Sequence, residues 1–316
     1  MAESYNTLAG LVQFNDKNLS DEEMDDLLRD APFLAKLYSQ AASNGTEHKY
    51  LVRTGASSAA FRAANAGLDK TTSIKKLVTD TLAIMDGSFH ADVALAQEAK
   101  NGIEAYLDEE FMDTMATVMS GAEKQVLYGV GADATGFAGL ADNAQLDTTG
   151  DGMVYSAGGT TADTQTSVFL IRSGKKDVSF IMGKEGEIVV EEDPKIVPWV
   201  AAAGASPTYP AYYVPATGYS GLQVGGAYSA ARICNLHASD AGATLTDDMI
   251  YEALALFPSS RPPNMIVMNR QSIKQLRASR TAVRTDGAAA PWPTEVEGIE
   301  IVLTDSVKNT EAVVTA

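Results

Sequence analysis

The sequence predicts an α+β fold in which strands and helices lie mostly in separate stretches of the chain. A helical period of three and four residues runs from about residue 93 to 127 and predicts one long helix. Three strand-like runs, SVFLIRS, DVSFIMG and EIVVEED, follow a glycine-rich stretch and are typical of an antiparallel meander. Near the end of the chain, PNMIVMNRQSIKQLRAS indicates a buried strand that leads into an amphipathic helix.

Composition bounds the class of protein. The chain has 316 residues, of which 45% are hydrophobic, so it can bury a large core. Its net charge of -17 argues against a general nucleic-acid binder, which would need a cationic surface. Cys234 is the single cysteine, which excludes an intramolecular disulfide and favours synthesis in a reducing cytoplasm. No apolar run reaches 18 residues, so no membrane-spanning helix is expected.

The N-terminal third predicts an arm followed by a long hairpin. SDEEMDDLLRDAPF contains a capping box formed by Ser20 and Glu23, and Pro32 is expected to end that helix before a short helix over residues 33–42. Residues 48–90 contain two strand-like runs, HKYLVRT and the half-polar TTSIKKLVTDTLAIMDG. Because an isolated hairpin is only marginally stable in water, this arm needs another surface to lie on.

The remaining elements have clear local signals. Gly102 and Gly121 inside the long helical pattern indicate tight packing or a bend. PWVAAAGASPTYPAYYVPATGYSG is rich in proline and predicts an extended connection, and LQVGGAYSAARICNL predicts a return to strand. LTDDMIYEALALFP predicts a helix that Thr246 caps, and Asn269 is expected to cap the later one.

Two loops resemble ligand sites without completing one. The glycines at 129, 131, 136 and 139 do not have dinucleotide-loop spacing, and they follow a helix, so a helix C-cap and turn is the better interpretation. DTTGDGMVYSAG resembles a calcium loop that begins at Asp147, but Gly158 stands where a bidentate Glu is needed. We therefore expect no metal, cofactor or catalytic site.

The other candidate residues have ordinary structural explanations. His48, His90 and His237 lie in unrelated segments without a metal-binding pattern, and Cys234 is expected to be a buried, inert thiol. A basic stripe in the last helix is expected to pair with acidic neighbours or to lie in solvent. Its members are Arg270, Lys274, Arg277 and Arg284.

The order of these elements resembles the tailed-bacteriophage major capsid proteins of the Hong Kong 97 type. MIVMNRQSIKQL (265–276) is similar to the family's strand that ends in Met-Asn before a helix. VEGIEIVLTDSVKNTEA (296–312) resembles the strand that follows, with Glu300 where proline is common. LYGVGADATGFAGL (127–140) resembles the exit of the spine helix, and FRAANAGLDKTTSIKKLVTDTLAIMDG (61–87) resembles the extended loop.

This resemblance implies the Hong Kong 97-like phage capsid fold with four parts. They are an N-terminal arm (1–47), an extended β-hairpin loop (48–90), a spine helix with a peripheral β-rich domain (91–240), and an axial strand–helix unit with a C-terminal return strand (241–316). The extended loop is expected to contact neighbouring subunits through Phe61, Arg62, Asn65, Lys70, Lys75 and Lys76. The three lysines lie where some family members place a cross-linking lysine.

The resemblance also implies a function. It predicts a structural major capsid protein, not an enzyme, that assembles as pentamers and hexamers into an icosahedral shell around phage double-stranded DNA. The expected location is the virion capsid, after assembly in the host bacterial cytoplasm. A separate scaffolding protein and a portal are the expected partners, with decoration proteins as a further candidate. An acidic shell suits this role because packaged DNA can slide along it without sequence-specific binding.

Two alternatives stay open at this point. An encapsulin-like nanocompartment would have the same fold but would enclose cargo enzymes. A soluble enzyme would use the glycine-rich turn or the Asp147 loop, and it would be a compact monomer or small oligomer. The long hairpin without an evident partner counts against the enzyme.

Overall fold

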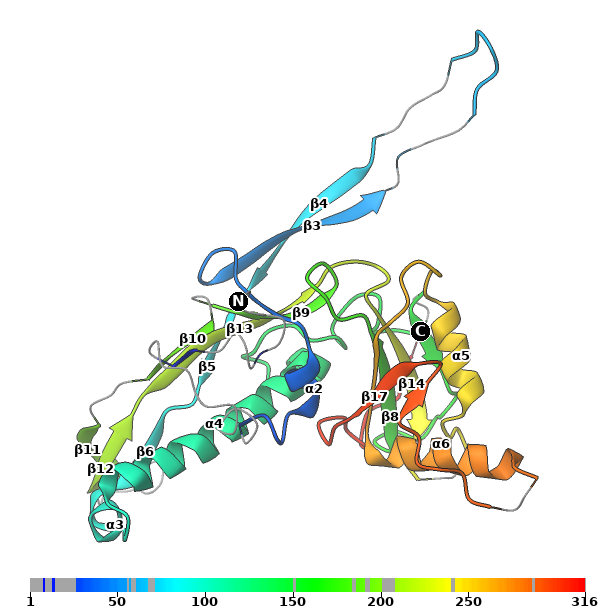
Figure 1. The fold of residues 1–316 in the computed structure, drawn as a ribbon. Coiled ribbons are helices and arrows are strands. Elements are labelled where there is room, and N and C mark those ends of the chain that lie inside the picture. Colours follow the sequence, from blue (N-terminus) through cyan, green and yellow to red (C-terminus); the bar gives the residue numbers. More distant parts are fainter. Residues whose placement is uncertain are drawn as a thin grey trace.

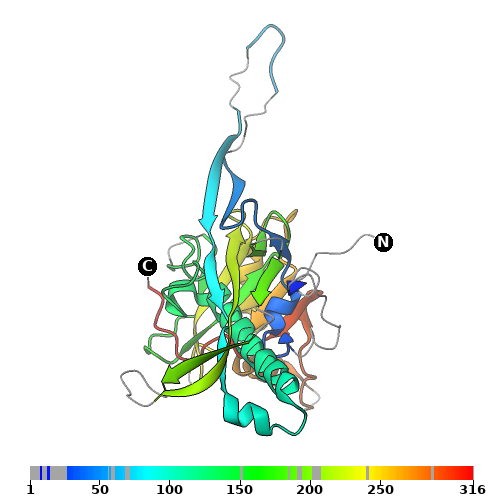
Figure 2. The same ribbon diagram turned by 90° about the vertical axis from the view of Figure 1, so that its left-hand side faces the viewer.

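The structure is a computed structural model that describes residues 8, 13–14, 27–55, 57, 61–67, 72–149, 152–183, 186–190, 194–200, 208–239, 242–285 and 288–315. It contains three sheets beside one long helix, and a two-stranded hairpin that projects from them (Figure 1). The hairpin consists of β3 (Glu47–Gly55) and β4 (Ile74–Thr81). Figure 2 shows it standing clear of the rest of the chain.

The C-terminal sheet has the strand order β16-β17-β15-β8-β14-β7. Helices α5 (Asp247–Ala255) and α6 (Arg270–Val283) lie beside it (Figure 1). Every residue of its central strands β8 and β15 is buried, as the continuous apolar runs predict. Its strands are β7 (Val154–Ser156), β8 (Gln165–Ile171), β14 (Ala230–His237), β15 (Met265–Met268), β16 (Glu295–Val296) and β17 (Ile299–Leu303).

Two further sheets make up the other half of the chain. The central sheet has the order β1-β10-β13-β9-β2, with β5 also paired to β13, and the distal sheet has the order β11-β12-β6. The central strands are β1 (Gln13–Phe14), β2 (Ser39–Ala41), β5 (Ala83–Asp86), β9 (Val178–Met182), β10 (Glu187–Val190) and β13 (Ala216–Val224). The distal strands are β6 (Phe89–Asp92), β11 (Lys195–Val200) and β12 (Thr208–Val214).

The predicted meander is wrong in its strand order. β8 lies in the C-terminal sheet, whereas β9 and β10 lie in the central sheet with β13 between them. The chain crosses from one sheet to the other after β8 and again after β13. The two connecting segments are in close contact with each other. A Cβ on Gly225, in the second segment, would lie 1.9 Å from the carbonyl oxygen of Lys176 in the first. Alternation within a strand sets its faces but not its partner, which explains the error.

The proline-rich stretch also differs from its prediction, because it supplies strands β11 and β12 of the distal sheet. Proline lacks a donor and is tolerated on an edge strand, which is where Pro198 lies in β11. Pro210 precedes the part of β12 that pairs with β6. Neither proline therefore removes a hydrogen bond from the pairing between β12 and β6.

The helical pattern forms two helices instead of one. Helix α3 (Val93–Glu98) and helix α4 (Ile103–Tyr128) are separated by a turn at Gly102, whose φ of 96° favours glycine. Gly102 therefore marks a break, whereas a Cβ on Gly121 would meet open space, so that residue is not a site of tight packing. The exit of α4 is the 3-10 turn η2 (Gly129–Gly131), as the glycine-rich stretch predicts.

The described part of the N-terminal arm packs against its own chain. Leu8, Leu27 and Phe33 belong to the main hydrophobic core. Leu27 is helical and a turn over residues 28–30 follows it, and Pro32 begins the next helix, α2 (Pro32–Lys36), where its missing N–H is not needed. The expected helix over 33–42 therefore ends early, and β2 follows it. Ser20 and Glu23, the predicted capping box, lie outside the described residues.

The sheets do not follow the boundaries expected at residues 90 and 240. The hairpin proper ends at Thr81, and β5 and β6 already pair with β13 and β12 of the other sheets. β8 and β14, expected in the peripheral domain, form one sheet with β15 and β17 of the axial unit.

The two helix caps are confirmed, because Thr246 and Asn269 accept hydrogen bonds from the backbone N–H of Met249 and Ser272.

A buried carboxylate ties the arm to helix α4 and to the end of β17. Glu123 on α4 is fully buried and accepts hydrogen bonds from the backbone N–H of Leu34, at 2.9 Å, and from the hydroxyl of Thr304. Burial raises the pKa of Glu123, and these hydrogen bonds oppose that rise. Three segments that are distant in sequence thus meet at one side chain.

A buried ion pair joins helix α4 to the C-terminal sheet and to the end of the chain. Arg232 on β14 contacts Glu311 at 2.8 Å. Glu311 also accepts hydrogen bonds from the hydroxyls of Tyr128 on α4 and Ser167 on β8, both at 2.5 Å. The guanidinium of Arg232 lies 5.5 Å from the ring centre of Phe169. The charge of Glu311 is therefore compensated on several sides, which a buried charge requires.

We expect Met115→Asp to destabilise the subunit by about 3 kcal/mol or more, because it buries an unpaired charge in the core. Met115 is 1% exposed and lies against Gly87. Urea denaturation of the unassembled subunit measures the change. Thr117→Asp, on the exposed face of the same helix, is the control. A Met115→Asp variant as stable as this control would contradict the assigned core face.

We expect Glu123→Gln to alter the pH dependence of stability. Because the folded pKa of Glu123 is raised, the folded state binds its proton more tightly than the unfolded state does. The contribution of Glu123 to stability is therefore complete below the unfolded pKa and is lost as the pH rises through the folded pKa. The difference in unfolding free energy, wild type minus Gln variant, should fall above a pH of about 4.5. A flat difference from acidic to neutral pH would contradict this assignment.

We expect Glu311→Ala to lower the unfolding free energy by about 3–5 kcal/mol, because it leaves Arg232 buried without its counter-charge. Replacing both partners, as Arg232→Met with Glu311→Leu, should cost less than the sum of the two single changes. Denaturant melts of wild type, Arg232→Met, Glu311→Leu and the double variant give the coupling between the two residues. Strict additivity of the two costs would show that they do not act as a pair.

Candidate assembly surfaces

The hairpin presents apolar and basic side chains that its own chain leaves exposed. Leu51 and Leu77 form a cross-strand pair, and their side chains are 64% and 58% exposed. Arg53 and Lys75 are the next pair on the same face. Because these two leucines are exposed, they contribute little to the stability of the free subunit. The row therefore indicates a surface that another molecule covers.

The root of the hairpin is held firmly against the central sheet. The Nε2 atom of His48 lies 2.7 Å from Oε1 of Gln223 on β13, and its ring stacks on Tyr50 with the centres 5.7 Å apart. The hydroxyl of Tyr50 donates to the carbonyl oxygen of Val224 at 3.3 Å. Burial and the nearby Asp80 raise the pKa of Tyr50, so it stays a neutral donor. These contacts set the direction in which the hairpin projects.

The expected contact residues lie at two levels of the hairpin. Phe61 is fully exposed in the turn beyond the strands, and Arg62 there donates to the carbonyl oxygen of Ala66 at 3.3 Å. Asn65 has the left-handed φ of 60° that a tight turn needs. Lys75 and Lys76 are consecutive on β4, so they point to opposite faces of the ribbon. Lys70 lies outside the described residues.

The glycine-rich turn has no free phosphate cradle. Its backbone N–H groups at Val130 and Gly139 both donate to Oδ2 of Asp142, at 2.8 and 3.1 Å. A Cβ on Gly139 would lie 2.3 Å from the backbone nitrogen of Gly129, so glycine is required for close packing. An acidic side chain already fills the position that a phosphate would take. The turn is therefore a helix exit, as predicted.

The described residues hold no group of three or more His, Cys, Asp or Glu that is placed to bind a metal ion. Asp151 of the calcium-like loop is outside them, and Thr149 of that loop donates its N–H to the carbonyl oxygen of Thr315. His48, His90 and His237 lie in separate places. Cys234 is buried, and burial raises the pKa of its thiol. Within the described part of the chain, no helix is long and apolar enough to cross a membrane.

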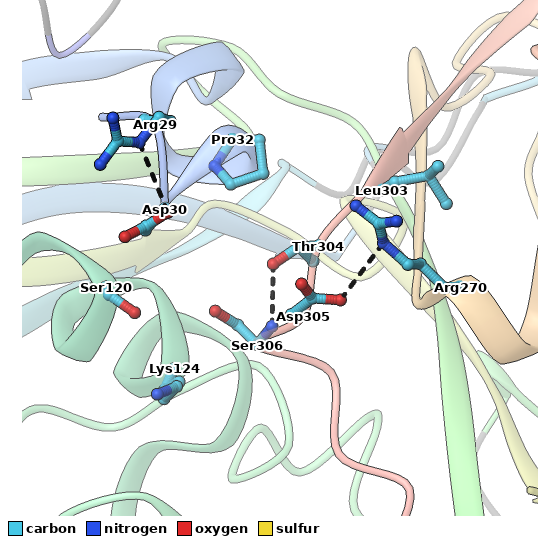
Figure 3. A pocket seen from close by; sticks show the side chains of 10 residues that line it. All are labelled: Arg29, Asp30, Pro32, Ser120, Lys124, Arg270, Leu303, Thr304, Asp305 and Ser306. Atoms are coloured by element: carbon cyan, nitrogen blue, oxygen red, sulfur yellow. Dashed lines mark hydrogen bonds and ion pairs between the residues drawn. The ribbon is translucent and has the colours of Figure 1, made fainter. Parts of the chain in front are cut away.

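The basic stripe of α6 is shorter than predicted, because the helix ends at Val283 and Arg284 follows it. Arg270 lies 3.8 Å from Asp305 at the edge of an open pocket of about 470 Å³, and Arg29 lies 3.9 Å from Asp30 on its other side (Figure 3). Both pairs are exposed and so contribute little. Arg277 donates to the carbonyl oxygen of Ala290 at 2.8 Å. Arg270 thus pairs with an acidic neighbour, as expected, whereas Arg277 binds a backbone carbonyl and lies over the ring of Trp292.

Comparisons with known proteins give the class of this chain. A family model described as "Major capsid protein GP7" matches residues 19–315. The solved structure of bacteriophage Epsilon15 is 20% identical, with a TM-score of 0.62 and coverage of 88% of each chain. The capsid of bacteriophage JBD30 decorated with minor capsid protein trimers is 13% identical, with a TM-score of 0.48 over 92% of this chain and 96% of that one.

An encapsulin, SrpI from Synechococcus elongatus, is 11% identical, with a TM-score of 0.42 over 70% of this chain and 97% of that one. No curated protein matches the chain. The family match spans nearly the whole chain, and the Epsilon15 structure confirms the predicted fold class. The chain therefore belongs to the family of the major capsid protein GP7, with the Hong Kong 97-like fold, and it is a structural protein of a bacteriophage capsid and not an enzyme.

Proposed function

We propose that the hairpin ties each subunit to its neighbours, and that the shell is built from pentamers and hexamers around double-stranded DNA. The observation that carries this proposal is the exposed Leu51–Leu77 pair on a ribbon whose root is fixed. A fixed root delivers this surface to a defined place on the next subunit. A neighbour can then bury apolar area that the subunit itself leaves exposed.

The predicted loop residues belong to this contact. Phe61, Arg62 and Asn65 supply an apolar side chain, a cation and an amide to the far part of the hairpin. Lys70, Lys75 and Lys76 supply further cations to the same loop. We propose all six as intersubunit contacts.

The finer partners are part of the same proposal. A separate scaffolding protein directs assembly in the host cytoplasm, a portal occupies one vertex, and decoration proteins bind the outside. The net charge of -17 supports DNA contents that do not adhere to the inner surface. Nucleic acid inside purified shells would support this reading, and a single cargo protein in its place would favour an encapsulin.

We expect replacement of residues 55–73 by a short Gly-Ser linker to leave the core folded but to abolish closed shells. Removing a surface loop changes the closure entropy little, and the contacts of His48 and Tyr50 at the root remain. The variant should melt cooperatively and elute as monomers or isolated capsomers. Phe61→Ser, which alters an exposed side chain only, should weaken assembly without changing the melt. Unfolding of the linker variant, or normal shells from it, would contradict the proposal.

A further inference from the structure

An open groove of about 930 Å³ lies at the root of the hairpin, between β3–β4 and the two crossings that connect the sheets. Six cations line it: Arg172, which pairs with Asp177, and five others, namely Arg53, Lys75, Lys175, Lys176 and Arg261. Leu51 and Tyr228 lie between them, with 64% and 46% of their side chains exposed. The groove thus combines positive charge with apolar contact area on a chain of net charge -17.

The charge of this groove is not neutralised by the described part of the chain. Its one carboxylate, Asp177, already pairs with Arg172 at 3.0 Å. None of the five cations forms an ion pair with a described carboxylate. A group of like charges held close together repels itself, so an acidic surface that enters the groove would relieve this repulsion.

Helix α4 presents a matching surface in its first half. Glu104, Asp108, Glu109 and Asp113 are exposed, and the stretch Ile103–Met115 contains no Lys or Arg. None of these four carboxylates forms an ion pair with a described cation. Tyr106 is half-buried beside them. The first half of α4 therefore carries exposed carboxylates on several sides, and Glu109 and Asp113 lie on the same side as Tyr106, which complements a basic groove with apolar walls.

The two surfaces lie on different parts of one subunit. Helix α3, which directly precedes α4, is at the end of the molecule farthest from the hairpin in both views (Figures 1 and 2). The groove and the acidic face cannot meet within one copy. A contact between two different patches of identical subunits is head-to-tail, and such contacts close into rings when the rotation allows it.

We propose that the cationic groove at the hairpin root of one subunit receives the acidic first half of α4 of the next subunit in the capsomer. This rests on the proposed function, to which it adds a specific intersubunit contact. Single exposed ion pairs contribute about 0.2–1 kcal/mol each, so several pairs and the apolar contact act together. Charge complementarity mainly selects the register of the two copies and speeds their encounter.

A charge-swap experiment tests the contact. The groove variant is Lys175→Glu with Lys176→Glu, and the helix variant is Glu109→Lys with Asp113→Lys. The contacts that Gln40 and Gln223 make with Lys175 use its backbone oxygen, so they survive the change. Each variant alone should lower the yield of closed shells by about tenfold or more, and the combined variant should restore it. Negative-stain microscopy and sedimentation velocity measure the yield.

The control is Glu252→Lys with Glu295→Lys, which raises the net charge as much as the helix variant does but alters exposed residues on α5 and β16. It should assemble normally. Normal assembly of the groove variant, or failure of the combined variant while both single variants melt like wild type, would overturn the contact.

Two further outcomes separate this inference from its alternatives. If the groove variant assembles normally but its shells lose DNA, the groove binds phosphate and the proposed contact is wrong. If the linker variant of residues 55–73 forms no shells while both charge variants assemble normally, the hairpin proposal stands and only this contact fails.

Discussion

The buried pair of Arg232 and Glu311 is the interaction on which the relation between the two halves of the subunit depends. Glu311 lies near the end of the chain, yet it binds the last residue of α4 and two strands of the C-terminal sheet. Glu123, which precedes Tyr128 on the same helix, makes a second junction with Leu34 of the arm and with Thr304. Helix α4 is thus fixed to both the arm and the C-terminal sheet by buried, hydrogen-bonded charges, which tolerate few other arrangements.

This rigid body explains the unequal distribution of apolar surface. The arm, the C-terminal and central sheets and α4 share one large core, and β6 and β12 of the distal sheet pack with α4 in a second, smaller cluster. The hairpin is different, because only its root contacts that body and its leucine pair stays exposed. Under the proposed function this division suits a shell subunit, since the body keeps its shape while a neighbour covers the projecting surface.

Charged side chains are also distributed unequally over the subunit. The chain as a whole is acidic, so free subunits repel one another at long range. Cations concentrate at the hairpin root, and carboxylates concentrate on the first half of α4. The glycine-rich turn could have been mistaken for a phosphate site, but Asp142 occupies its N–H groups. The local fields therefore favour contacts between copies over ligand binding.

The sequence by itself determined what depends on neighbouring residues: the caps at Thr246 and Asn269, the buried face of α4 around Met115, the exit of that helix and the existence of the hairpin. Phe61, Lys75 and Lys76 were expected as loop contact residues from the family resemblance, and the structure shows that all three are exposed. Only the tertiary structure decided that β13 separates β9 from β10, that prolines lie in β11 and β12, and that the arm enters the core. It alone brought Glu311 to Arg232, and Lys175 and Arg53 to one groove, because strand partners and charge contacts are set by packing between segments far apart in the chain, which no local pattern records.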